Sequence, residues 1–125
     1  KAVTTDPTYT GDPFTASYVR FGDMVHFHIE IDFSTVTNFG VGQYYVTLPH
    51  NSRYQYMFRS GVLHDSDDDR RFHISGEVAA GSKDLYLYTT DQHGNRLYDF
   101  AFDKDEPVTL TTADDFDISG TYIIQ

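Results

Sequence analysis

The segment Met24–Phe33 constrains the fold more than any other part of the chain, because every second residue in it is apolar. Its apolar positions are Val25, Phe27, Ile29, Ile31 and Phe33, and they alternate with Met24, His26, His28, Glu30 and Asp32. In a helix these apolar side chains would point all around the circumference, whereas a period of two places them on one face of a strand. The pattern predicts a half-buried β-strand.

Seven further stretches are rich in aromatic and β-branched residues, which favour strands: Gln43–Leu48, Tyr54–Leu63, Arg71–Val78, Leu85–Thr90, Leu97–Phe102, Val108–Thr111 and Thr121–Ile124. Turn-forming residues separate them, among them Pro49–Ser52, Ala80–Ser82 and His93–Asn95. No segment of twelve or more residues keeps a helical period. We therefore expect an all-β fold, an antiparallel, jelly-roll-like β-sandwich of about eight strands with almost no helix.

A chain of 125 residues is long enough for one core and too short for two comfortable ones. Residues 1–13 contain Pro7, Gly11 and Pro13 and are expected to form an extended lead-in, with residues 14–125 as a single sandwich domain. Because the first residue is Lys1 and not Met, we expect the chain to be part of a longer polypeptide or a processed product.

The charge of the chain limits its partners. Nine basic and 19 acidic residues give a net charge of −10, which repels phosphate backbones and anionic lipid surfaces. Apolar stretches are far shorter than the roughly 20 residues that cross a bilayer as a helix. We expect no nucleic-acid partner and no membrane insertion. The absence of cysteine excludes disulfides, thiolate zinc sites and a cysteine nucleophile.

His26, His28 and Glu30 lie on the polar face of the predicted strand, each about 7 Å from the next. Two imidazoles and a carboxylate can bind a divalent metal, and Gly22 followed by the histidine pair resembles the first motif of the cupins. The spacing differs from the cupin pattern, and no second motif follows. The alternative is that these residues form the polar face of an amphipathic strand or line a subunit interface.

The run Asp65–Asp69 is a candidate cation loop. Asp65, Asp67 and Asp69 occupy the first, third and fifth positions of an EF-hand loop, but Arg70 and Gly76 stand where that loop requires Gly and Glu. An EF-hand is therefore excluded. A looser calcium or magnesium site and an exposed acidic hairpin tip are the two remaining interpretations.

Tyrosine pairs are the candidate ligand-binding residues, because exposed aromatic rings stack on sugars and anchor protein interfaces. The pairs are Tyr54 with Tyr56 and Tyr86 with Tyr88, and a spacing of two places both rings of a pair on one face of a strand. Lining of the core is the alternative role for these rings.

Motifs of hydrolytic enzymes are missing from the sequence. It contains no Gly-x-Ser-x-Gly elbow, no phosphate-binding glycine loop and no His-Glu-x-x-His segment, and the adjacent Asp114 and Asp115 would face opposite ways in a strand. We therefore expect a protein that is not an enzyme, with no catalytic residues and no cofactor.

Three segments in order, Tyr18–Val25, Gly42–Pro49 and Leu110–Tyr122, resemble the C-terminal β-sandwich domains of tailed-phage tail-fibre, minor tail and receptor-binding proteins. The resemblance implies a virion structural module that forms homotrimers, contacts other virion tail proteins and mediates adhesion to a host glycan or surface protein. It implies location on the virion, an extracellular particle.

In such a trimer, His26 and His28 could lie near the threefold axis. The alternative functions are a carbohydrate-binding module of a secreted protein, a capsid decoration domain, and a cupin-like metal-binding protein that uses His26, His28 and Glu30.

Overall fold

The structure, a computed structural model, describes residues 1–93 and 96–125, with side chains described outside 91–98. Its strands are β1 (Thr8–Tyr9), β2 (Phe14–Phe21), β3 (Met24–Asp32), β4 (Val36–Asn38), β5 (Tyr45–Thr47), β6 (Tyr56–Asp65), β7 (Arg70–Val78), β8 (Asp84–His93), β9 (Arg96–Ala101) and β10 (Asp115–Ile123). A short 3-10 helix, Phe33–Thr35, follows β3. The expected all-β class is confirmed, and within the described residues no helix is long and apolar enough to cross a membrane.

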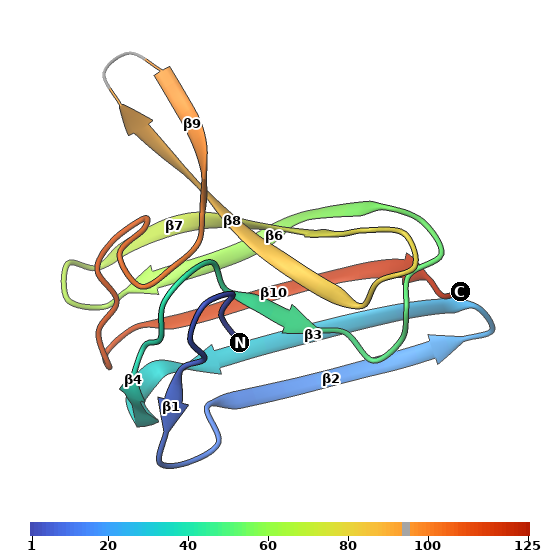
Figure 1. The fold of residues 1–125 in the computed structure, drawn as a ribbon, viewed down its shortest axis with the longest axis horizontal. Helices are drawn as coiled ribbons and strands as arrows, with labels where there is room; N and C mark the ends of the chain where they lie inside the picture. Colours follow the sequence, from blue (N-terminus) through green and yellow to red (C-terminus); the bar gives the residue numbers. More distant parts are fainter. Residues whose placement is uncertain (94–95) are drawn as a thin grey trace.

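The main sheet is antiparallel and has the order β2-β3-β10-β6-β7-β8-β5, with β9 paired to β8. A separate small sheet pairs β1 with β4. The main sheet bends into two layers, and β8 runs obliquely across β6 and β10 in the view of Figure 1. Rings from the two layers meet in the core, where the Phe102 and Phe116 centroids lie 5.6 Å apart. The expected sandwich-like arrangement is confirmed, with eight strands in the main sheet.

Strand β3 has the alternation that the sequence predicts. Val25, Phe27, Ile29 and Ile31 are buried and the residues between them are not. The strand pairs with β2 on one side and with β10 on the other over nearly its whole length. A two-residue turn joins β2 to β3, and Gly22 adopts a φ of 58° there, a conformation that glycine enters without steric cost.

Two predicted strands differ from the structure. Val108–Thr111 is not a strand, because its donors bond within the loop: the Leu110 N–H donates to Lys104 O at 2.7 Å and the Thr111 N–H to the Asp114 side chain. The last strand is longer than Thr121–Ile124, since β10 already begins at Asp115. The expected turn His93–Asn95 lies in part outside the described residues.

The first residues pack against the sandwich in an extended conformation. Ala2 is buried and forms a bridge with Tyr44, and Thr5 forms another with Val41. Gly40 makes this approach possible, because its φ is 74° and a Cβ atom there would overlap the carbonyl oxygen of Thr5. The segment therefore lies beside β5 and borders the end of the sandwich.

Gly120, in the middle of β10, allows the ring of Phe58 to lie directly on the backbone. A Cβ atom at position 120 would overlap the Phe58 ring, which itself packs edge-on against Phe27 with a centroid distance of 5.1 Å. A glycine inside a strand often marks such a close approach.

We predict that Gly120→Ala lowers the free energy of unfolding by about 1–3 kcal/mol, because the methyl group must displace a buried ring. Urea denaturation measures the change. Phe58→Leu in the Gly120→Ala background should recover part of the loss, and an additive effect of the two substitutions would contradict the steric explanation.

Two buried tyrosines contribute a pH dependence. The hydroxyl of Tyr44 donates to Phe39 O at 2.7 Å, and burial, with a smaller effect of the Asp103 and Asp105 charges, raises the pKa of Tyr44 well above its ordinary value. The hydroxyl of Tyr122 donates to His50 O at 3.0 Å, and burial raises the pKa of Tyr122 as well. The folded protein therefore holds both rings neutral.

We predict that the stability from these two groups is fully present below about pH 10, the ordinary pKa of tyrosine, and is lost as the pH rises above it. In the unfolded chain both rings ionise there, so each contributes a fall of at most about 1.4 kcal/mol per pH unit. Urea denaturation between neutral and alkaline pH measures the slope. Tyr44→Phe should reduce it, Tyr54→Phe, at an exposed ring, should leave it unchanged, and equal slopes in all three proteins would contradict the assignment.

Candidate functional site

His26, His28 and Glu30 lie on the outer face of β3, away from the core. His26 Nδ1 lies 2.8 Å from the Thr121 hydroxyl on β10, and His28 Nε2 lies 3.1 Å from Glu30 Oε1. The structure thus pairs His28 with Glu30 but gives His26 a different partner. The three residues are not a group whose ligand atoms come together around one point, and the outer face of β3 is an open polar surface.

The tyrosine pairs differ in their surroundings. Tyr54 is exposed, but the neighbouring Tyr56 stacks on Phe58 with an interplanar angle of 10° and so belongs to the edge of the core. Tyr86 and Tyr88 lie on the outer face of β8, because the buried residues Leu85, Leu87 and Thr89 alternate with them. Of the predicted ligand-binding rings, Tyr54, Tyr86 and Tyr88 are therefore at the surface.

An open polar hollow of about 280 Å³ surrounds Tyr88 on this outer face. Its lining includes His73 and Glu77 of β7, Arg59 of β6 and Asp99 of β9. An aromatic ring among hydrogen-bonding side chains is an arrangement that can hold a sugar. The tyrosine could be predicted from the sequence, whereas the polar side chains come from three other strands.

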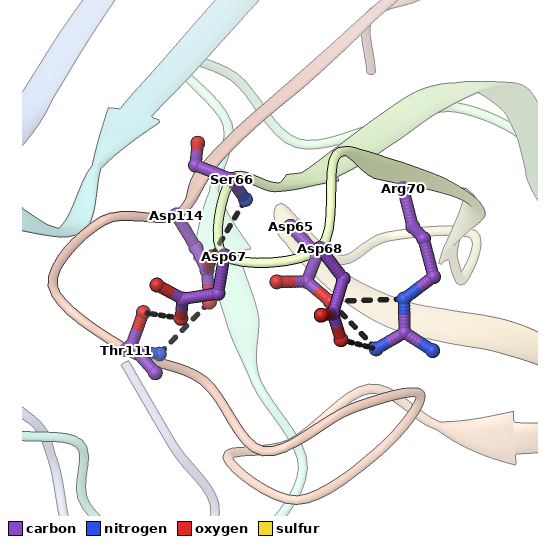
Figure 2. Close-up of polar contacts among 7 residues, drawn as sticks. All are labelled: Asp65, Ser66, Asp67, Asp68, Arg70, Thr111 and Asp114. Carbon is purple, nitrogen blue, oxygen red and sulfur yellow. Dashed lines mark hydrogen bonds and ion pairs between the residues drawn. The ribbon is translucent and has the colours of Figure 1, made fainter.

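The acidic cluster is formed by Asp65, Asp67 and Asp114, the one group of three or more potential metal ligands among the described residues. One carboxylate oxygen of each lies within 4.8 Å of the others, and Asp65 and Asp114 are 3% and 1% exposed. Asp65 and Asp67 come from the β6–β7 hairpin, and Asp114 lies just before β10 (Figure 2). Carboxylate oxygens in this arrangement are the ligands that Ca²⁺ prefers.

Donors from the protein already contact the acidic cluster. Arg70 Nη2 lies 2.8 Å from Asp65 Oδ2, and this hydrogen bond raises the pKa of Arg70 further above its usual value. The Thr111 hydroxyl donates to Asp67 at 2.8 Å (Figure 2). Asp114 accepts the backbone N–H groups of Ser66, at 3.2 Å, and Thr111, at 2.8 Å. The cluster therefore ties the β6–β7 hairpin to the loop before β10.

The three aspartates of the cation loop predicted from the sequence do not lie together in the structure. Asp65 and Asp67 belong to the acidic cluster, but Asp69 lies beside His64, with 3.3 Å between His64 Nε2 and Asp69 Oδ1. Asp69 has a φ of 51°, which turns the hairpin and carries its side chain away from the other two. Asp114 was not expected here, because its approach depends on the packing of a loop 48 residues from Ser66.

Strand β2 is an exposed edge of the main sheet. All eight of its residues are exposed, including Phe14, Tyr18, Val19 and Phe21. It pairs with β3 only, so its other edge has no strand partner among the described residues. Proteins usually protect such an edge with charge, proline or a covering segment, because its free N–H and C=O groups can pair with another chain.

An apolar groove, here called the edge groove, runs along the inner face of β2. One part of about 390 Å³ is lined by Phe14, Ala16, Ile29, Tyr45, Val46 and Thr47, together with Lys1, Asp6, Pro7 and Tyr9 of the N-terminal segment. The adjoining part, of about 250 Å³, is lined by Ala16, Tyr18, Phe27, Ile29, Thr47 and Pro49. The groove is the seam at which the bent sheet brings β5 opposite β2 without joining them. The groove could not be predicted from the sequence, because it lies between two strands whose nearest residues, Phe21 and Tyr45, are 24 positions apart in the chain.

Comparison with models of protein families, with curated proteins and with solved structures found no match for this chain. Its candidate functional surfaces are therefore defined by geometry alone: the polar hollow around Tyr88, the acidic cluster, and the β2 edge with its groove.

We predict that Asp114→Ala lowers the free energy of unfolding by about 2–4 kcal/mol, because it leaves two partly buried backbone N–H groups without their acceptor. Asp115→Ala, at the exposed neighbouring position, should change it by less than about 0.5 kcal/mol. Chemical denaturation measures both. Equal effects of the two substitutions, or a calcium-dependent stability that Asp114→Ala abolishes, would contradict a purely structural role for the acidic cluster.

Proposed function

We propose that this chain is a virion structural module, the C-terminal domain of a phage tail-fibre or minor tail protein, which assembles as a homotrimer and mediates adhesion to the host surface. The observation that carries the assembly is the exposed β2 edge: a strand of eight residues with large apolar side chains on both faces and an apolar groove beside it. A surface of this kind marks an interaction site in a folded protein.

Adhesion is supported by a different face of the molecule. The polar hollow around Tyr88 lies on the outer face of β7 and β8, whereas the edge groove lies between β2 and β5. A module that assembles through one surface therefore keeps the other free for a host glycan or surface protein. His73, Glu77 and Tyr88 offer the hydrogen bonds and the ring face that a sugar requires.

A carbohydrate-binding module of a secreted protein is the second candidate. The cross-strand rings of Tyr45 and Tyr86 favour it, since their centroids lie 5.3 Å apart at an angle of 31°, and Tyr86 is 37% exposed. Such a module needs no assembly. Oligomeric state and the kind of surface bound therefore distinguish the two functions.

We expect light scattering at micromolar concentration to give about three times the 14.3 kDa mass of one chain. The fluorescently labelled protein should bind whole cells of some species in a bacterial panel, and Tyr88→Ala should weaken this binding about tenfold or more, the effect of losing one stacked ring with its hydrogen bonds. Tyr54→Ala, an exposed ring outside the hollow, is the matched control. A monomer that binds isolated polysaccharides but no cells would favour the carbohydrate-binding module.

A further inference from the structure

The two faces of β2 are complementary in shape. Its outer face carries Val19 and Phe21, which are 48% and 69% exposed and project near the turn to β3. Its inner face carries Phe14, Ala16 and Tyr18, because these residues pair with the buried Ile31, Ile29 and Phe27 of β3 and directly opposed residues share a face. One face thus projects apolar side chains and the other borders the edge groove.

We propose that a second copy of this chain covers the edge groove, with Val19 and Phe21 of one copy entering the groove between β2 and β5 of the next. This contact rests on the proposed trimer and assigns the surface through which it forms.

Charge favours a second copy as the occupant. With a net charge of −10, two copies repel each other over most of their surfaces. Among the described strands longer than three residues, only β2 contains no Asp or Glu. Its one charged side chain, Arg20, donates to the Gly22 carbonyl oxygen at 2.7 Å. The β2 edge is therefore the strip along which two acidic chains can approach without placing carboxylates against each other.

The size of the surface also fits. An eight-residue strand is about 26 Å long, and the exposed parts of Phe14, Tyr18 and Phe21 amount to roughly 300 Å² of aromatic surface per copy. The free strand edge and the walls of the groove add to this area, and stable interfaces bury roughly 800 Å² per partner. The groove is suited to apolar groups, because its only charged lining residues among those described are Lys1 and Asp6, and both belong to one of its two parts.

The arrangement is head to tail. The projecting side chains and the edge groove lie on opposite faces of β2. Each copy therefore inserts Val19 and Phe21 into one neighbour and accepts the same side chains of another neighbour in its own groove. Contacts of this heterologous kind close into rings when the rotation between copies allows it. A ring of three copies matches the proposed trimer. A symmetric dimer that joins identical faces would not place the projecting side chains of one copy in the groove of the other.

The test uses two variants of the whole chain. Phe21→Ser removes the projecting ring, and Ala16→Trp fills the groove from its wall. Val41→Ser is the control, since Val41 is an exposed apolar residue, at 50%, that lines neither part of the groove. Circular dichroism confirms folding. If Ala16→Trp does not fold, Thr47→Trp on the opposite wall replaces it.

We expect each variant alone to be a monomer in light scattering, the control to stay a trimer, and a mixture of the two variants to form a two-chain complex that grows no further. The two-chain complex arises because one intact projection meets one intact groove. Variants that remain trimers would overturn this contact while leaving the proposed assembly in place. A mixture that stays monomeric would overturn the head-to-tail arrangement. A wild-type protein that is a monomer would overturn the proposed trimer itself.

Discussion

The row of buried side chains along β3 is the interaction on which the rest of the structure depends. Val25 and Phe27 are essentially inaccessible to solvent, and the strand that carries them has partners along both edges. The opposite layer packs onto this row, so that Val46 of β5 and Ile29 of β3 line the same groove. Because a single slip in register would turn the whole row to solvent, the burial of β3 also holds the register of β2 and β10.

The sequence predicts what is local and periodic. The strict alternation in β3 and the all-β class could be read directly, because each depends on neighbouring residues. Strand β2 as a whole could not, since its apolar positions change face between Tyr18 and Val19 and so show no single period. Val108–Thr111 has the composition of a strand, but the loop offers its donors closer acceptors.

For each candidate site, the sequence predicted the residues that belong to one strand or one loop, but not the residues that other elements contribute. Tyr86 and Tyr88 lie on one face of β8, as a spacing of two requires, but the polar side chains that complete the hollow belong to other strands. Asp114 joins Asp65 and Asp67 only after β10 is in place beside β3 and β6. Contacts between residues of different strands depend on the strand order, and strand order in an antiparallel sandwich is determined by long-range packing.

The place of β10 in the sheet has a consequence for how the chain folds. The last strand in sequence lies between β3 and β6 and joins the N-terminal hairpin to the strands of the middle of the chain. During synthesis, the β2–β3 and β6–β7 hairpins emerge first, each with an apolar face and no layer to pack against. They can join through the sheet only when residues 115–123 have left the ribosome, so the core is completed late.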